Sequence, residues 1–456
     1  MSRRRVAALP VAAVVMGVLA AGARRARAEG ERIVDIEVVD NIKTNDETVL
    51  LIADVKTGDE FTFALADRIK VDLVSSGLFK DVNVFSTPLP DRGGVKLTIV
   101  AKDKHSWVIA PTVYLQPGNT GVGCGFGENN LLGSNKKLLV YGQVATSDSL
   151  FIAGLRDPAI AGSPFYLQLD TFIRHERVTE FDSRDEIFGQ PEPERISSMN
   201  YINFGATAGV NVWKGMAIDG RLRAARVFFT DPVWAEEAVN RAPETHQGVP
   251  PAPDKDGYDV STELRLTRDK RANWYGVTTG SVFGLSYERG LPGFGSDWEY
   301  WYAGARLLLA YKFWERHNMV VKTGLGYGDN MPFQQEYTSG GTGLRGYQNR
   351  QFRGDTKGSF TFEYSVPFFT ISSFAFRGLV FYDTAYTAFN NTSENDSRNY
   401  LVGQTDNELS KWRNGVGAGF RIYVRSVVIP LLGLDWGYGI EANDYHVYFA
   451  VGLTEL

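Results

Sequence analysis

The sequence has few of the residues on which disulfide pairing, metal binding and catalysis commonly rest. Cys124 is its single cysteine, so no internal disulfide can form, and its distance from the N-terminus argues against a lipid-anchored start. The five histidines show no H-E-x-x-H spacing, and no G-x-S-x-G turn is present. We therefore expect no enzyme activity, no catalytic residue, no metal site and no cofactor. A membrane-embedded lipase or protease that assembles its site from distant strands remains the alternative.

Long hydrophobic runs are missing beyond the N-terminus. Residues 1–28 combine three early arginines, an apolar stretch at 6–23 and the small-residue motif Ala26-Arg-Ala28, which together predict a signal peptide cleaved before Glu29. A single membrane anchor is the alternative, but Pro10 and the small-residue exit favour cleavage. No later apolar run reaches ~18 residues, so the mature chain has no candidate membrane helix.

A surplus of positive charge is also absent. Removal of residues 1–28 takes away six arginines and no acidic residue, which leaves 42 basic against 53 acidic side chains and a net charge of −11. Such an acidic chain is a poor match for a polyanion, and we expect no nucleic-acid partner.

Aromatic residues and glycines are plentiful, at 13% of the chain and 48 residues, and they lie in short alternating segments. In 165–174, 358–366 and 430–440, apolar side chains occupy one face and polar side chains or glycines occupy much of the other. This pattern is typical of a membrane barrel with a wet lumen. A soluble sandwich alternates in the same way, so the pattern alone leaves both folds open.

Residues 31–103 are of a different kind. A strand-like segment at 33–39 precedes Thr44 and Glu47, whose spacing predicts a capping box that opens a short helix. A second helix follows, with apolar residues at i, i+4 spacing and Gly77 at its end. Two strands complete the segment, at 78–86 and 94–102. The order β-α-α-β-β predicts a small α/β module of a size that folds alone.

The run Gly341-Thr-Gly343-Leu-Arg-Gly346 matches the G-x-G-x-x-G spacing of dinucleotide-binding turns. That fingerprint requires a helix after the glycines, because the helix N-terminus binds the pyrophosphate. The residues that follow lack an apolar repeat at helical spacing and run into strand-like alternation. We therefore do not expect a nucleotide site here.

Several segments, taken in chain order, carry a resemblance to a known family. They are TGDEFT, SSGLFKDVNV, GVKLTIVAKDK, GENNLLGSNKKL, GLRGY, FTFEYSVPF, FYDTAY and VGAGFRIYVRSVVIPLLGLDWGYG. The first three resemble a POTRA domain, and the others resemble the barrel of the BamA/TamA superfamily of outer-membrane assembly and transport proteins (bacterial surface antigen family). The resemblance covers essentially the whole mature chain.

The resemblance implies a signal peptide at 1–28, one POTRA domain at 29–103 and a transmembrane antiparallel β-barrel of sixteen strands at 104–456. Strand counting agrees, because five strands fit after the GLRGY loop, and that loop joins strands 11 and 12 in the family. The five strands are expected at 358–368, 374–384, 412–424, 430–440 and 444–454. The long polar connection NNTSENDSRNYLVGQTDNE is expected outside the cell.

The GLRGY loop is the predicted functional motif, formed by Gly343, Leu344, Arg345, Gly346 and Tyr347. We expect its glycines to let it turn back into the lumen, where a guanidinium needs carboxylate partners. The predicted partners are Glu363 and Asp435, which lie on non-lipid faces, and Asp383, which occupies the family's aspartate position. A merely solvated loop arginine is the alternative.

The function implied by the resemblance is assembly of outer-membrane proteins. Unfolded β-strand clients would be received by the POTRA domain, at an edge formed by Val95, Lys96, Leu97, Thr98 and Ile99, and by the barrel seam between the first and last strands. A polypeptide-transport pore or specialised secretion partner on the same scaffold is the alternative, favoured by the single POTRA domain and by Leu456, where such strands usually end in an aromatic residue. Expected partners are unfolded outer-membrane or secreted polypeptides, outer-membrane lipid and periplasmic chaperones or accessory proteins. The expected location is the bacterial outer membrane, with the POTRA domain in the periplasm.

Overall fold

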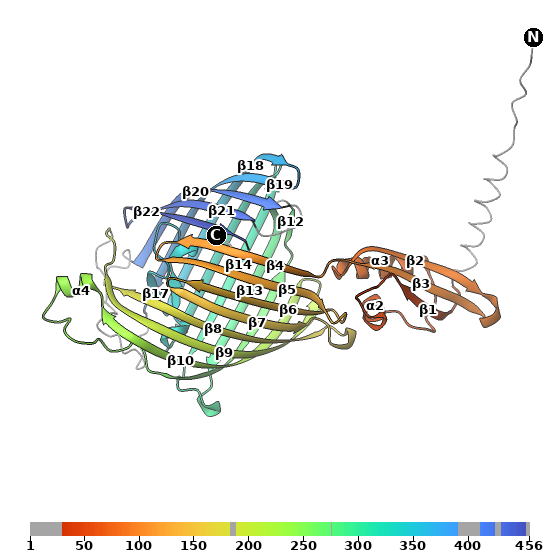
Figure 1. Ribbon diagram of the computed structural model, residues 1–456, viewed down its shortest axis with the longest axis horizontal. Helices are drawn as coiled ribbons and strands as arrows, with labels where there is room; N and C mark the ends of the chain where they lie inside the picture. Colours follow the sequence, from red (N-terminus) through yellow and green to blue (C-terminus); the bar gives the residue numbers. More distant parts are fainter. Residues whose placement is uncertain (1–29, 183–187, 275, 391–410, 425–429, 453–456) are drawn as a thin grey trace, which may run out of the picture. The chain divides into compact units, whose positions relative to one another are not determined.

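The computed structural model describes residues 30–182, 188–274, 276–390, 411–424 and 430–452. The predicted signal peptide, nearly all of the long polar connection and Leu456 lie outside the described residues. Within the described ranges, no helix is long and apolar enough to cross a membrane. The chain forms two compact units, an N-terminal α/β unit and a β-barrel (Figure 1).

The N-terminal unit has the predicted β-α-α-β-β order, as expected for one POTRA domain. Its elements are β1 (Ile33–Val39), α2 (Asp46–Ala53), α3 (Phe63–Ser75), β2 (Phe79–Leu89), the 3-10 turn η1 (Pro90–Arg92) and β3 (Gly94–Asp103). The three strands form one sheet in the order β1-β3-β2, in which β3 runs parallel to β1 and antiparallel to β2.

The core of this unit lies between the sheet and the two helices. Val95, Leu97, Ile99 and Ala101 are fully buried along one face of β3, and they pack with Ile69, among others, from α3. Helix α3 begins at a threonine cap, since the Thr62 hydroxyl accepts a hydrogen bond from the Leu65 N–H at 3.0 Å. It ends before Gly77, whose φ of +75° is easily adopted only without a side chain.

The sheet order corrects one expectation. Val95, Lys96, Leu97, Thr98 and Ile99 do not form an edge, because β3 is the central strand and pairs with β1 on one side and β2 on the other. Alternation of buried residues shows which face of a strand packs on the core, but it does not show how many neighbours the strand has. The last strand of the unit inserts between the first two, which leaves β1 and β2 at the edges.

The predicted capping box at Thr44 is also wrong. Helix α2 begins one residue later, with Asn45 at the cap position and no side-chain capping bond. The Thr44 hydroxyl instead donates to an Asp103 carboxylate oxygen at 2.5 Å. The Thr44 N–H also donates to Asp103, at 3.3 Å, and a capping box would pair that N–H with the Glu47 side chain.

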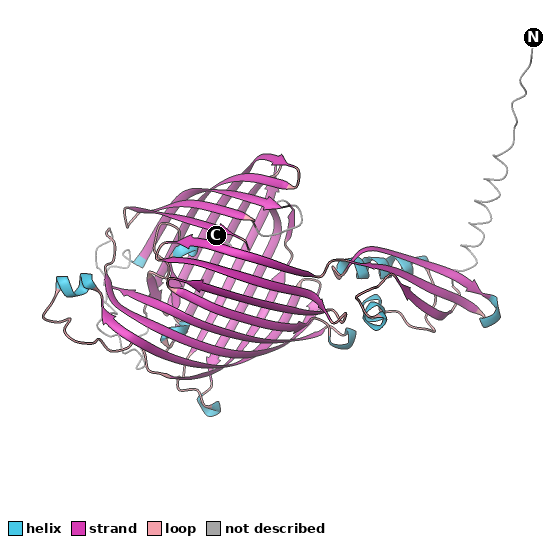
Figure 2. Cartoon of the chain, viewed as in Figure 1, coloured by secondary structure: helices cyan, strands magenta, loops and turns pink. Residues whose placement is uncertain are grey.

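The barrel is closed and consists of sixteen antiparallel strands, as predicted (Figure 2). They are β4 (Trp107–Gln116), β5 (Asn119–Leu131), β6 (Lys136–Ala145), β7 (Asp148–Asp157), β8 (Phe165–Phe181), β9 (Pro193–Trp213), β10 (Met216–Trp234), β11 (Gly257–Asp269), β13 (Val277–Gly290), β14 (Trp301–Phe313), β15 (His317–Asp329), β18 (Thr356–Ile371), β19 (Phe374–Ala388), β20 (Trp412–Val424), β21 (Leu432–Gly439) and β22 (Asp444–Val451). The short β12 (Ala272–Trp274) pairs with the start of β13 and extends that hairpin. Pairing of β22 with β4 closes the ring.

The alternating faces fall as the sequence pattern indicates. Phe165 and Leu169 of β8 and Trp436 of β21 are exposed on the outer face, whereas Asp435 is fully buried on the inner face. An apolar outer surface and a polar interior suit a barrel surrounded by lipid. The soluble sandwich is excluded, because the sheet closes on itself.

The strands after the GLRGY loop lie close to their predicted positions. β18 to β22 overlap all five predicted segments, and β20 coincides with 412–424. The loop joins β15 to β18, the eleventh and twelfth barrel strands. Short elements lie in the connections: η2 (Ile160–Gly162), α4 (Glu236–Arg241), η3 (Pro292–Phe294), η4 (Phe333–Gln335), β16 (Tyr337–Ser339), η5 (Gly341–Gly343) and β17 (Phe352–Gly354).

Candidate functional site

The loop between β15 and β18 folds back onto the inner wall of the barrel. Its two arms, β16 and β17, pair with each other, and the glycine-rich turn η5 begins the tip. No α-helix follows those glycines, as the sequence indicated, so the G-x-G-x-x-G spacing lacks the helix terminus that a nucleotide site needs. The tip instead presents Leu344, Arg345 and Tyr347, each 1% exposed or less, to the wall.

Arg345 lies among all three predicted carboxylates. Its guanidinium donates to both oxygens of Asp383, with Nε at 2.7 Å and Nη2 at 3.0 Å. Nη1 donates to Asp435 at 3.1 Å, and Nη2 lies 3.0 Å from a Glu363 oxygen. The guanidinium carbon also sits 3.4 Å from the centre of the Phe381 ring. This fork-shaped contact is the geometry that arginine makes best with carboxylates.

Two further cations complete the cluster. Arg421 of β20 donates to both oxygens of Asp435, at 2.5 and 2.7 Å. Lys322 lies 3.5 Å from Glu363. Three carboxylates therefore face three cations, of which Arg345 and Arg421 are buried and Lys322 is nearly half exposed. Removal of one partner from such a cluster is strongly unfavourable, because a buried charge is left without compensation.

Glycines on the wall let the loop tip approach the strands. A Cβ on Gly415 of β20 would lie 2.0 Å from the Arg345 carbonyl oxygen, and one on Gly437 of β21 would lie 2.9 Å from the Arg345 Cβ. Gly346 has a φ of +103°, and a Cβ there would lie 2.3 Å from the Gly439 nitrogen. Only glycine therefore fits on both sides of this contact.

Two tyrosines fix the backbone of the tip. The Tyr448 hydroxyl accepts a hydrogen bond from the Gly346 N–H and donates one to the Tyr347 carbonyl, both at 2.9 Å. The Tyr347 hydroxyl reaches the Glu441 carboxylate at 2.5 Å. Because Tyr448 belongs to β22, the loop tip is bonded to the last barrel strand as well as to β19 and β21.

Three further contacts join the loop to strands β8 to β11. Arg350 donates to the Glu176 carboxylate of β8 at 2.5 Å. Gln335 donates to Asp259 of β11 at 2.9 Å. Phe333 is fully buried in an apolar cluster with residues of β8 to β10. The loop thus contacts both sides of the barrel interior.

These features agree with a comparison of the whole chain against known families. The sequence profile of the Omp85 superfamily domain matches residues 130–454. The chain belongs to the Omp85 superfamily. It is an outer-membrane β-barrel of the BamA/TamA type, and the family supports a role in insertion or transport without deciding which.

Solved structures share the fold at low sequence identity. BamA from Haemophilus ducreyi lacking POTRA domains 1–3 is 17% identical, with a TM-score of 0.67 over 92% of this chain and 84% of that chain. CdiB from Acinetobacter baumannii is 15% identical, with a TM-score of 0.61 over 93% and 74%. CdiB from Escherichia coli is 14% identical, with a TM-score of 0.59 over 93% and 77%. No curated protein sequence matches the chain.

Within this Omp85 barrel, the structure brings Arg345, Glu363, Asp383 and Asp435 together. Sequence reasoning missed the glycine wall on β20 and β21, the two-way hydrogen bond of Tyr448 and the contacts of the loop with β8 and β11. The alternation of Gly437 and Gly439 with Trp436 and Tyr438 was the one available signal. Among the described residues, no group of three or more histidine, cysteine or acidic side chains is arranged to hold a metal ion.

Proposed function

We propose that this Omp85 protein inserts β-strand clients into the outer membrane through the seam of its barrel. The observation that carries the proposal is that the first part of β22, Asp444–Tyr448, lies within the described chain and has no partner on β4. Among the described residues, Phe449, Ala450 and Val451 are the positions of β22 that pair across the seam. By contrast, β14 and β15 pair continuously from Trp301 to Phe313. Unpaired backbone groups at a seam are a template for an added strand.

The periplasmic end of the pathway is the α/β unit. Since β3 is central, the strand offered to a client is an edge of the sheet, and β2 is the better candidate. The start of β1 is already covered, because the Ile33 N–H donates to the Asp59 carbonyl and the Gly58 N–H to that of Ile33. An extended client could form main-chain hydrogen bonds along β2, and these bonds do not depend on most of its side chains.

The loop inside the barrel supports insertion at the seam over passage through the lumen. A polypeptide that crossed the lumen would have to displace Phe333, break the Arg350–Glu176 pair and expose the Arg345 cluster. A client that pairs at the seam requires none of these changes. Transport of one polypeptide through the same scaffold is therefore our second hypothesis. A lock on the seam distinguishes insertion from transport.

The proposed partners and location follow from the same pathway. Clients are unfolded outer-membrane or secreted polypeptides, with periplasmic chaperones or accessory proteins upstream and outer-membrane lipid around the barrel. We place the α/β unit in the periplasm, as a domain bounded at residue 103. A fragment of residues 29–103 should then melt cooperatively, because it contains its own apolar core. A melt without a transition would contradict that boundary.

A reversible lock on the seam tests the insertion pathway. Tyr114 and Ala450 are paired across β4 and β22, so Tyr114→Cys with Ala450→Cys, in a Cys124→Ser background, places two thiols on directly opposed residues. The oxidised protein should fail to support the outer-membrane proteome, as depletion of the protein should, and reduction should restore it. The matched control is Ala310→Cys with Val320→Cys, a pair inside the β14–β15 ladder, whose oxidation should have no effect.

Two outcomes would contradict the proposal. One is an oxidised seam lock that supports the outer-membrane proteome as well as its reduced form does. The other is depletion that leaves the outer-membrane proteome intact while one secreted polypeptide accumulates in the periplasm. The second result would establish transport instead.

A further inference from the structure

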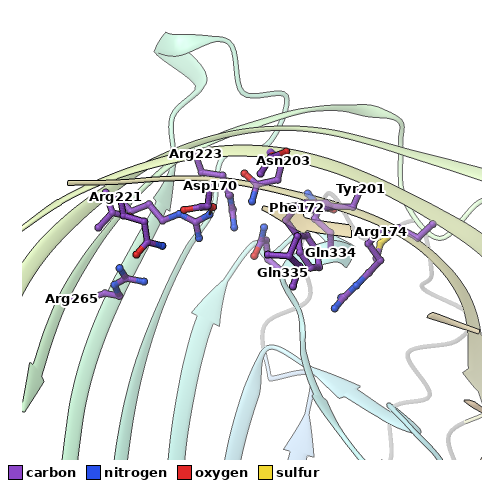
Figure 3. A pocket seen from close by; sticks show the side chains of 15 residues that line it. Asp170, Phe172, Arg174, Tyr201, Asn203, Arg221, Arg223, Arg265, Gln334 and Gln335 are labelled. Atoms are coloured by element: carbon purple, nitrogen blue, oxygen red, sulfur yellow. Dashed lines mark hydrogen bonds and ion pairs between the residues drawn. The ribbon is translucent and has the colours of Figure 1, made fainter. Parts of the chain in front are cut away.

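A cavity lies on the inner wall, away from the Arg345 cluster. Its volume is about 410 Å³, and strands β7 to β11 and the loop residues Gln334 and Gln335 line it (Figure 3). The lumen-facing side chains of adjacent strands form its floor, and the two glutamines come from the loop that crosses the barrel. Both the barrel wall and the loop therefore form the cavity.

Arginine is the most frequent charged residue of the lining. Arg174 of β8, Arg221 and Arg223 of β10 and Arg265 of β11 all contribute to it. Among the described lining residues, Asp170 is the one carboxylate. Arg174, Arg223 and Arg265 are also ion-paired with carboxylates outside the lining, Arg223 with two of them.

The arginines keep hydrogen-bonding capacity that the protein does not use. Arg221 donates from Nη2 to Asp170 at 2.5 Å, yet its buried Nε has no protein partner in the described chain. The buried Nε of Arg223 likewise has none there, although Nη2 of that residue meets Tyr300 at 2.9 Å. Thr207 adds a buried hydroxyl that can donate and that lacks a partner within the described residues. Buried donors without partners are rare because they are costly.

A glycine makes room for this arrangement. A Cβ on Gly205 of β9 would lie 2.6 Å from the Arg221 Nη2 and 2.9 Å from the Asp170 carboxylate. The Arg221–Asp170 pair crosses β9 at the position where that strand has no side chain. Arg221 is thereby held against the wall, with a fifth of its side chain still accessible from the cavity.

The aromatic residues favour an anion over a sugar. A saccharide would stack on a free ring face, but the Arg174 guanidinium already lies 4.8 Å from the centre of the Phe172 ring. The edge contact between Phe172 and Tyr201, with centroids 6.0 Å apart, occupies the rings further. What the cavity offers is a set of guanidinium N–H groups, which match the oxygens of a carboxylate or phosphate.

We propose that this cavity binds a small oxyanion, a phosphate ester or a carboxylate, on Arg221 and Arg223. The proposal is independent of whether the barrel inserts or transports polypeptides. It adds a ligand site that the loop partly covers through Gln334 and Gln335. An occupant would therefore contact both the barrel wall and the loop.

Calorimetric titration of the purified full-length chain in detergent tests the site. The probes are pyrophosphate and succinate at constant ionic strength, with maltose as the neutral probe. At least one anion should bind saturably at one site, and the anion that binds more tightly identifies the phosphate or the carboxylate class. Arg221→Gln should weaken binding by about tenfold or more, since a charge-assisted hydrogen bond is lost. The affinity of Arg221→Lys should lie between those of the unmodified protein and Arg221→Gln, because an ammonium keeps the charge but lacks the planar pair of donors.

The matched control is Arg306→Gln, because Arg306 lines a neighbouring cavity of about 500 Å³. This variant should leave the affinity for the anion within about twofold of the unmodified protein. Heat-modifiable gel mobility verifies that each variant is folded. If Arg221→Gln does not fold, Arg221→Lys, which keeps a cation beside Asp170, takes its place as the test. The proposal is overturned if neither anion binds, if maltose competes with the anion, or if the Arg221 and Arg306 variants weaken binding equally.

Discussion

The loop tip is held by Glu363, Asp383, Asp435 and Tyr448, which we call the loop seat. The seat and the seam differ in how many contacts hold them. At the seat, buried charges, glycine contacts and tyrosine hydrogen bonds converge on Arg345, Gly346 and Tyr347. At the seam, by contrast, Asp444–Tyr448 of β22 are described and have no partner on β4. The strands that hold the loop, β19 to β22, form the more fixed side of the seam. Opening is then expected to begin with movement of β4.

The largest effect should follow from loss of the loop cation. Arg345→Ala leaves Glu363, Asp383 and Asp435 clustered, at a cost of about 3 kcal/mol or more if the site stays dry and less if lumen water enters. The barrel should still form, but its gel-mobility shift should occur at a lower temperature and its function should fall. Arg345→Lys should restore part of the loss.

Arg350→Ala and Arg353→Ala serve as controls for that loss. Arg350 is more than a quarter exposed, and Arg353 pairs with Glu336 inside the loop itself. Both variants should be milder than Arg345→Ala. Equal effects of the three alanine variants, or an Arg345→Ala variant without effect, would show that Arg345 contributes no more to stability and function than the other loop arginines do.

A smaller effect is expected when the charges stay and only the close approach is blocked. Gly346→Ala combines a strained φ with a Cβ that meets Gly439, which should destabilise the seat by about 1–3 kcal/mol. Gly343→Ala is the matched control in the same loop, because a Cβ there meets no atom of the described chain within 4 Å. The temperature of the gel-mobility shift measures both, and equal shifts would contradict the close-approach argument.

Tyr448→Phe should have a smaller effect again. It removes the hydroxyl that bonds the Gly346 N–H and the Tyr347 carbonyl but keeps the ring, at a cost of about 1–2 kcal/mol. Because Tyr448 belongs to β22, the variant should also raise the rate at which a cysteine at position 450 reacts with a thiol reagent, in a Cys124→Ser background. An unchanged reaction rate would show that the contacts of the loop seat do not affect the seam.

The smallest effect should arise at a contact outside both regions. Burial lowers the pKa of His246, but hydrogen bonds to the Ala242 carbonyl and the Glu194 carboxylate, and the charge of Glu194, raise it above its ordinary value of 6.5. A raised pKa in the folded state stabilises the protein at low pH, and this contribution is lost as the pH rises through the folded-state pKa. His246→Gln should therefore lower the shift temperature at pH 6 but hardly at pH 9. A difference that grows with pH would refute this assignment.

Much of the fold could be predicted because its signals are local. The i, i+4 spacing marked α3, and alternation marked β18 to β22 and the faces on which Glu363 and Asp435 lie. The resemblance supplied the position of Asp383. These signals reach over one helix turn or one strand, which is the range over which side-chain periodicity acts.

What could not be predicted depends on pairing between distant segments. The position of β3 between β1 and β2 depends on which strands pair with it, and this pairing leaves no mark on the alternation of β3 itself. The bonds of Tyr448 to the loop and of Gln335 to Asp259 join residues of separate strands and loops. Thr44 shows the reverse case, since its N–H donates to the distant Asp103 and not to the nearby Glu47.

The seat of Arg345 also sets an order of events during folding. Its partners Asp383 and Asp435 follow it in the chain by 38 and 90 residues, and Tyr448 follows Gly346 by 102. The loop is thus synthesised before the surface that receives it, and closing such long segments is slow compared with local structure formation. Docking of the loop must wait until β19 to β22 are in place. A docked loop therefore marks a barrel whose last strands have been completed.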